Sequence, residues 1–185
     1  SGPVLLLAVP GSGKTTVLVS RIGYLIAQGV PPENILTMTY TVSAARDMSR
    51  RFASFFGQPL ADRLEFRTIN GLSARIIQHY ERVKGRQAFT LVTEEGRLAA
   101  LVGELYRKAT GEFATESTVR SLRTAITYCK NRQMTQEEIE AYQVEDIPFA
   151  KLYRQYHAEL RRRRWMDYDD QMVYAAQILR QHGDI

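Results

Sequence analysis

Apolar residues in the first 80 positions fall into short continuous runs, separated by segments in which they recur at helical spacing. The runs predict strands buried in a parallel sheet, at residues 4–8, 35–40 and 64–67. The helical spacing predicts helices at residues 14–28, 44–56 and 72–80. This alternation indicates an α/β protein whose parallel strands are joined by right-handed crossovers.

Beyond a polar connection at residues 84–87, the pattern changes to helices that follow one another without predicted strands. Five helices are predicted in this part, at residues 97–110, 118–132, 135–142, 149–164 and 168–181. Thr135 and Glu138 have the spacing of a capping box, which marks one of the helix starts. Helices without intervening strands predict a bundle-like subdomain that is separate from the sheet.

The junction of the first predicted strand and helix carries the sequence Gly-Ser-Gly-Lys-Thr, from Gly11 to Thr15. Glycines let the backbone curl so that successive N–H groups point at a phosphate chain, and the helix start adds about half a positive charge. Lys14 would reach the phosphates and the Thr15 hydroxyl would hold Mg²⁺, so we predict both residues to be catalytic. The predicted nucleotide-binding residues are Ala8, Val9, Pro10, Gly11, Ser12, Gly13, Lys14, Thr15 and Thr16.

Composition narrows the setting in which such a protein works. Its 185 residues, 44% of them hydrophobic, suffice for one domain or for one domain with a sizeable insertion. No apolar run approaches the ~20 residues of a membrane span, so no membrane partner is expected. The single cysteine, Cys129, argues against a disulfide framework and favours a reducing, cytoplasmic setting. The net charge of +5 suits a polyanionic partner.

The motifs, taken in order, resemble the N-terminal part of a UvrD/Rep/PcrA-type superfamily 1 DNA helicase. The phosphate loop resembles the family's Ala-x-x-Gly-Ser-Gly-Lys-Thr form, which accounts for Ala8 where the usual loop has glycine. Residues 35–48 and 67–72 resemble the two motifs that follow in the family. Residues 89–92 resemble the entry to the family's helical insertion, and residues 166–172 resemble the segment where the chain returns from it. The resemblance covers nearly the whole chain.

The resemblance implies a RecA-like P-loop NTPase fold, with a parallel sheet that is incomplete in this chain and a helical insertion subdomain. It divides the chain into the first part of the ATP-binding domain at residues 1–85, the insertion at 86–166 and a returning helix at 167–185. The family's Asp-Glu-x-x motif, which holds Mg²⁺ and positions the attacking water, is expected after Ile185. We therefore expect the isolated chain to be inactive as an ATPase.

The activity that the resemblance implies is that of an ATP-dependent DNA helicase, which couples ATP hydrolysis to translocation and duplex unwinding in DNA repair or replication. ATP and Mg²⁺ are the implied cofactors, and single-stranded and duplex DNA are the implied partners. The implied DNA-binding residues are Tyr40, Thr41, Ser43, Thr68 and Asn70. Three of these residues also have a structural interpretation. Tyr40 could close the core of the sheet, and Thr41 or Thr68 could be helix N-caps.

Two other functions remain open at this point. A small P-loop kinase, which would phosphorylate a small molecule or a nucleotide, has a similar loop and a similar length, although the helical part shows no convincing arginine-rich lid. A non-catalytic module would only bind nucleotide or DNA.

Two further features favour structural interpretations. The arginine run 161–164 is typical of a solvated helix end, and the aspartates at 167, 169 and 170 are typical of helix capping rather than of a metal site.

Overall fold

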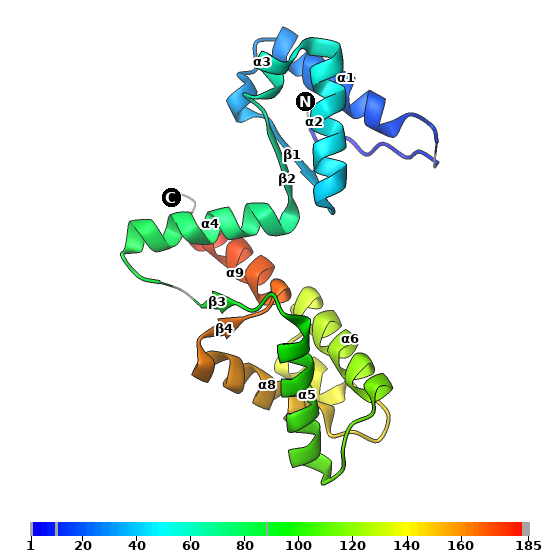
Figure 1. Cartoon of the computed structure of the whole chain (residues 1–185), viewed down its shortest axis with the longest axis vertical. Coiled ribbons are helices and arrows are strands. Elements are labelled where there is room, and N and C mark those ends of the chain that lie inside the picture. Colours follow the sequence, from blue (N-terminus) through cyan, green and yellow to red (C-terminus); the bar gives the residue numbers. More distant parts are fainter. Residues whose placement is uncertain (1, 10, 88, 183–185) are drawn as a thin grey trace. The chain divides into compact units, whose positions relative to one another are not determined.

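The protein, a computed structural model, is described at residues 2–9, 11–87 and 89–182, and it divides into two units, Ser1–Leu72 and Ser73–Ile185. The first unit holds a parallel sheet of two strands, β1 (Leu36–Thr39) and β2 (Glu65–Thr68) (Figure 1). The crossover that parallel pairing requires is made by α2 (Val42–Phe56) and by the helical turn α3 (Gln58–Ala61). Both strands and α2 were predicted from the sequence, whereas α3 was not.

The core of the first unit forms between α1 (Lys14–Ala27), α2 and the ends of the strands. A 3-10 turn, η1 (Pro32–Asn34), leads from α1 into β1. The buried residues of this core are Val19, Ile22, Ile35, Phe52, Ala61 and Leu64. A Cβ atom at Gly23 would lie 2.2 Å from Cζ of the Phe56 ring, so any larger residue at this position would have to displace this partly exposed ring.

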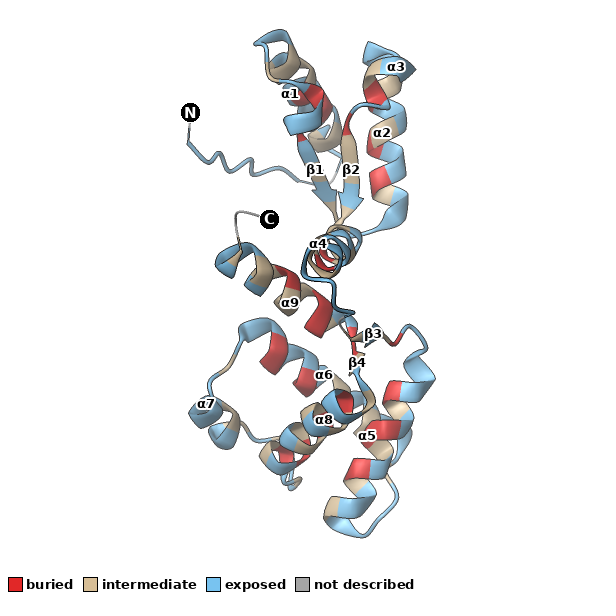
Figure 2. Ribbon diagram, turned by 90° about the vertical axis from the view of Figure 1, so that its left-hand side faces the viewer, coloured by how far each residue is buried: buried red, intermediate tan, exposed pale blue. Residues whose placement is uncertain are grey.

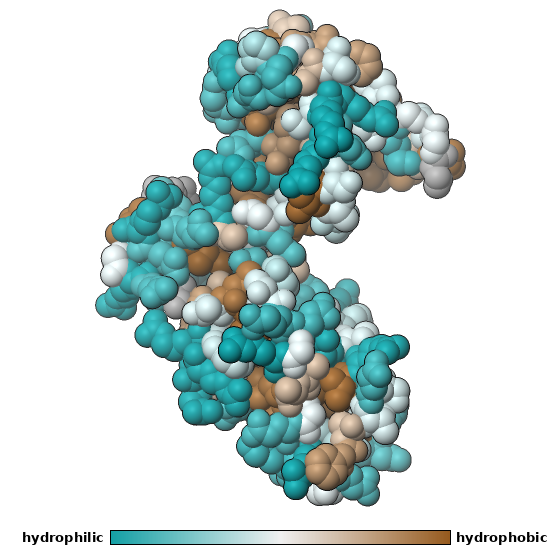
Figure 3. Space-filling model, viewed as in Figure 1, coloured by the Kyte–Doolittle hydropathy of each residue, from teal (hydrophilic) through white to brown (hydrophobic). Residues whose placement is uncertain are grey.

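The predicted strand at residues 4–8 is wrong. Residues 2–9 have no regular secondary structure, and Val4 and Leu7 are 83% and 84% exposed. Figure 2 shows this N-terminal segment in the pale blue of exposed residues. A continuous apolar run is stable as a strand only where neighbouring strands pair with its backbone and helices bury both of its faces. The described sheet offers no such covered position, because β1 itself leaves Leu36 and Met38 about half exposed. Apolar residues accordingly reach the surface around α1–α3 (Figure 3).

The second unit is mainly helical, and all of its predicted helices are present. The helices of this part are α4 (Ile69–Lys84), α5 (Glu95–Thr110), α6 (Glu116–Arg132), α7 (Gln136–Ala141), α8 (Phe149–Arg163) and α9 (Tyr168–Gln181). α4 begins in the last residues of the first unit. Leu101, Leu122 and Leu152 meet in the largest core, between α5, α6 and α8, and the lone Cys129 is fully buried in it. Figure 2 shows buried positions in red on these three helices.

Two short strands were missed by the sequence analysis. β3 (Thr90–Leu91) pairs in parallel with β4 (Trp165–Met166), so the helical segment from α5 to α8 begins and ends at neighbouring strands. The backbone N–H of Thr90 donates to the Arg164 carbonyl at 2.7 Å. Strands of two residues are too short to show a period of two, which is why the pattern predicted helices alone.

Candidate functional site

The phosphate loop opens α1 with two glycines in the left-handed region of backbone space. Gly11 has φ 80° and Gly13, the N-cap of α1, has φ 79°. A Cβ atom at either position would meet nothing within 4 Å, so the requirement for glycine is conformational rather than steric. The loop therefore has the backbone freedom that the sequence motif predicted.

The side chains of the loop bond to its own carbonyl groups. The Lys14 ammonium donates to the carbonyl oxygens of Val9 at 2.8 Å and Ala8 at 3.3 Å. The Ser12 hydroxyl and backbone N–H both donate to the Val9 carbonyl, at 2.7 and 3.2 Å. These contacts hold the Lys14 ammonium against the carbonyl groups of the loop. Pro10 lies outside the described residues.

The first turn of α1 fits a phosphate chain and a magnesium ion. Gly13 gives no side-chain cap and the first turn carries no acidic residue, so its N–H groups keep their capacity for an anion. Thr15 is half-buried and Thr16 exposed, at the second and third positions of α1. The Thr15 hydroxyl is the kind of oxygen ligand that Mg²⁺ prefers. Within the described residues, no group of three His, Cys, Asp or Glu side chains is placed to hold a metal.

A second set of predicted residues lies at the carboxyl ends of β1 and β2. The pairing register sets Thr39 opposite Thr68, which brings Tyr40 and Thr41 to the same edge of the sheet as Thr68 and Asn70. Tyr40 is 90% exposed, so the interpretation that it closes the core is wrong.

The two threonines of this edge are helix caps. Thr41 Oγ1 accepts from the Ala44 N–H at 3.1 Å and Thr68 Oγ1 accepts from the Gly71 N–H at 3.0 Å. Ser43 is exposed in the first turn of α2. The Asn70 side-chain oxygen is buried without a hydrogen-bond partner among the described residues, so it keeps an unused acceptor.

A groove of about 580 Å³ runs from this edge between α2 and β2. Thr68 and Gly71 line it at the strand end, and Arg46 and Ser49 of α2 line it further along. Neither Arg46 nor Ser49 was predicted to be a site residue, although Arg46 lies within the family-like segment 35–48 and Ser49 directly follows it on α2. Between described residues, the hydrogen bonds of the phosphate loop stay within residues 8–17, and none joins the loop to the strand ends.

The charged runs near the end of the chain have the structural roles that the sequence favoured. Arg162 and Arg163 pair with Glu159 at the end of α8. Asp167 and Asp170 form a capping box at the start of α9. Sequence reasoning missed the buried partner of these two aspartates, Lys130. The signal was available, because Lys130 lies four residues after the buried Ile126 on the apolar face of α6.

Parallel strands joined by a crossover helix, with a glycine loop opening the preceding helix, define an α/β protein with a candidate phosphate-binding loop. Over residues 1–185 the sequence matches the family model of the UvrD/REP helicase N-terminal domain, and the chain belongs to this family. No helix in the described ranges is long and apolar enough to cross a membrane.

Curated relatives of the chain carry helicase names. The ATP-dependent DNA helicase PcrA of Bacillus subtilis (strain 168) is 34% identical over 91% of this chain and 23% of its own length. The ATP-dependent DNA helicase Rep of Buchnera aphidicola subsp. Acyrthosiphon pisum is 28% identical over 100% of this chain and 29% of its own length. The ATP-dependent DNA helicase PcrA of Leuconostoc citreum is 27% identical over 100% of this chain and 25% of its own length. The chain thus spans about a quarter of the length of these relatives.

Proposed function

We propose that this chain provides the ATP-binding loop and part of the single-stranded DNA track of an ATP-dependent DNA helicase, which couples hydrolysis to translocation and unwinding in DNA repair or replication. The observation that carries the proposal is the geometry of the loop at α1. Its two left-handed glycines, its uncapped first turn and the Lys14 ammonium at the loop carbonyls would suit a phosphate chain, which supports the proposal. The names of the relatives support ATP and DNA as ligands.

In this proposal each loop residue has a separate task. The N–H groups of the first turn of α1 bind phosphate oxygens, and the Lys14 ammonium exchanges the Ala8 and Val9 carbonyls for phosphate oxygens. The Thr15 hydroxyl would hold Mg²⁺, which when bound would supply positive charge beside the phosphates. Ala8, Val9, Gly11, Ser12 and Thr16 complete the nucleotide contacts.

The strand ends supply the proposed DNA contacts. Tyr40 is placed to stack on a base, because its ring is almost fully exposed at the end of β1. Thr41, Ser43, Thr68 and Asn70 surround the same edge with hydroxyl and amide groups that suit phosphate oxygens. Stacking and backbone contacts tolerate any base sequence, which suits a protein that moves along DNA. In family terms, we propose that residues 1–85 belong to the ATP-binding domain and 86–166 to the helical insertion, with 167–185 returning from it.

The test is the ATPase activity of the full-length protein with and without single-stranded DNA. We expect DNA to stimulate hydrolysis and Lys14→Ala to abolish it, because the variant loses the ammonium that binds the phosphates. Lys151→Ala, which removes an exposed lysine of α8, is the matched control and should keep full activity.

Two outcomes would contradict the proposal. Phosphorylation of a small acceptor, with no response to DNA, would identify a P-loop kinase instead. ATP binding that is unchanged by Lys14→Ala, without any turnover by the full-length protein, would identify a non-catalytic module.

A further inference from the structure

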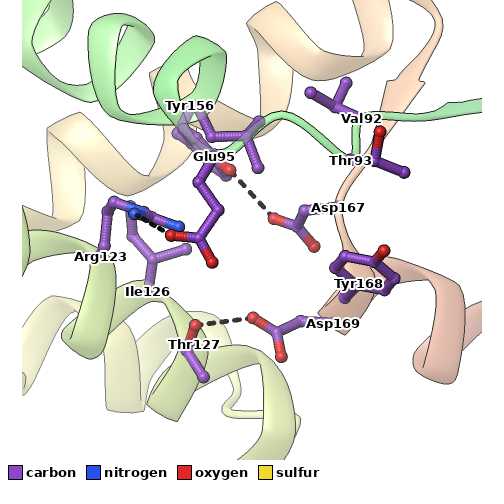
Figure 4. Close-up of a pocket in the computed structure, with 11 residues that line it drawn as sticks. Val92, Thr93, Glu95, Arg123, Ile126, Thr127, Tyr156, Asp167, Tyr168 and Asp169 are labelled. Atoms are coloured by element: carbon purple, nitrogen blue, oxygen red, sulfur yellow. Dashed lines mark hydrogen bonds and ion pairs between the residues drawn. The ribbon is translucent and has the colours of Figure 1, made fainter. Parts of the chain in front are cut away.

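Four polar side chains from three elements meet inside the second unit. The Lys130 ammonium of α6 lies 2.6 Å from Asp167 Oδ2 and 2.8 Å from Asp170 Oδ1. The Tyr156 hydroxyl of α8 donates to the same Asp167 oxygen at 3.0 Å (Figure 4). The side chains of Lys130, Asp167 and Asp170 are only 2%, 9% and 7% exposed. We call these four residues the Lys130 cluster.

The charges in the Lys130 cluster depend on one another. Burial acts to raise the pKa of Asp167, but the charge and hydrogen bond of Lys130 outweigh it and hold that pKa below its usual value. Burial raises the pKa of Asp170, and the neighbouring Asp167 charge adds to this effect. Two carboxylates thus share one ammonium in a site with little water. Removing that ammonium would leave buried carboxylates unpaired, which is strongly unfavourable.

The same two aspartates also start α9. Asp167 Oδ1 accepts from the Asp170 N–H at 2.8 Å, and Asp170 Oδ2 accepts from the Asp167 N–H at 3.3 Å. Each carboxylate therefore has one oxygen in the helix cap and the other on Lys130. The start of α9 and its attachment to α6 are formed by the same groups.

Further polar contacts join α6 and α9 beside the cluster. Asp169 accepts from the Thr127 hydroxyl at 2.7 Å, as Figure 4 shows, and from the Asn131 amide at 3.1 Å. The apolar contacts of α9 are made by the buried Ala175, which lies in a cluster with Ile77 and Met166, and by the partly buried Tyr174 and Ile178. The polar contacts therefore add to this apolar packing in holding α9.

We propose that the Lys130 cluster is a clamp that makes α9 move as one body with α6 and α8. With this clamp the chain has no hinge between Met166 and Asp167. The family resemblance puts the boundary between the helical insertion and the returning helix at this same point. Any hinge that serves the helical part lies elsewhere in the chain. The clamp depends only on contacts within the second unit and is independent of the proposed ATP and DNA sites.

Amide hydrogen exchange of the full chain tests the clamp, with Lys130→Met as the variant. Methionine keeps the length of the side chain but removes the charge, so the two carboxylates lose their cation. We expect exchange at residues 172–178 of α9 to become at least tenfold faster, while core amides of α5 and α8 change less than threefold. Glu116→Gln, which removes an exposed ion pair with Arg120 on the same helix α6, should change neither set.

A uniform acceleration of α5, α8 and α9 would overturn the proposal, because the cluster would then contribute only to overall stability. No acceleration in α9 would overturn it equally. If Lys130→Met does not fold, Tyr156→Phe gives the same comparison, since it removes only the hydroxyl that bonds Asp167. For that variant we expect α9 alone to exchange about threefold faster, and the same two outcomes would count against the clamp.

Discussion

Tyr40 shows how a single side chain separates a role in folding from a role in binding. Its ring is 90% exposed, so it contributes little to the core of the first unit. We predict that Tyr40→Ala changes the free energy of unfolding by less than about 0.5 kcal/mol. The same variant should weaken binding of single-stranded DNA by about 1–3 kcal/mol, the usual contribution of one stacked base.

Fluorescence anisotropy with a labelled oligothymidylate measures this loss, and chemical denaturation measures stability. Tyr24→Ala is the matched control, because Tyr24 is 54% exposed on α1 and lies outside the proposed DNA edge. Equal DNA affinity of Tyr40→Ala and the unmodified protein would remove Tyr40 from the DNA site.

His157 makes the second unit sensitive to acid. Burial, followed by the positive charge of Lys130, lowers the pKa of His157 from 6.5 to about 4, and its buried Nε2 atom has no hydrogen-bond partner in the described part of the chain. Between these pH values the unfolded chain binds a proton that the folded chain does not. Stability should therefore fall as the pH drops from 6.5 to 4, by up to about 3 kcal/mol.

Denaturation midpoints between pH 7 and pH 4 measure this loss. His157→Gln should flatten the pH dependence, because the amide does not titrate, whereas the exposed His79→Gln should leave it unchanged. A steep dependence that persists in His157→Gln would assign the effect to other groups, such as Asp167.

At the residue scale, the sequence predicted the phosphate loop but not the Lys130 cluster, and the reason is physical. Glycine, lysine and threonine at fixed spacing specify a local backbone path, which the structure shows at Gly11 and Gly13. The buried position of Lys130 depends instead on the carboxylates of Asp167 and Asp170, which lie 37 and 40 positions further along the chain. Only the fold brings such groups together, so a buried lysine looks like a surface lysine in the sequence.

Among the elements, helices were predictable because their signals are local. α7 is an example, since Thr135 Oγ1 accepts from the Glu138 N–H at 3.3 Å and the Glu138 carboxylate accepts from the Thr135 N–H at 2.7 Å. Predicted strands formed only where a partner strand was present. Residues 35–40 found a partner in β2, whereas the equally apolar residues 4–8 found none in the described sheet.

The capping box of α7 should matter to that helix alone. α7 has six residues and buries none of them, so its cap is a large part of its stability. We predict that Thr135→Ala costs about 1 kcal/mol and that the loss is confined to α7. Hydrogen exchange should show faster exchange at residues 138–141 and unchanged exchange in α5.

Thr124→Ala is a suitable comparison, because the Thr124 hydroxyl bonds a backbone carbonyl in the middle of α6 and caps no helix. A general loss of protection after Thr135→Ala would mean that α7 is more tightly coupled to the core than its exposure indicates.

The buried residues of the described chain fall into three clusters, one in the first unit and two in the second. Phe52 is fully buried in the first unit, and Trp165, the single tryptophan, reports on the second. We predict that Phe52→Ala destabilises the first unit by about 3–5 kcal/mol, because it leaves a cavity. The midpoint of unfolding followed by Trp165 fluorescence should not change. The unfolding transition followed by circular dichroism, which reports on both units, should broaden or split.

Leu122→Ala gives the reciprocal test, since Leu122 is fully buried in the second unit. It should lower the free energy of unfolding that Trp165 fluorescence measures by about 2–5 kcal/mol. Coincident transitions by both probes in Phe52→Ala would show that the two units unfold together.

The lone Cys129 has a consequence for kinetics. It is fully buried in the core formed by α5, α6 and α8, and burial raises the pKa of its thiol. A thiol reagent can therefore react with the folded chain only after this core has opened. At high reagent concentration, the rate of modification equals the rate of opening itself, and one mass measurement over time gives the lifetime of the closed helical core.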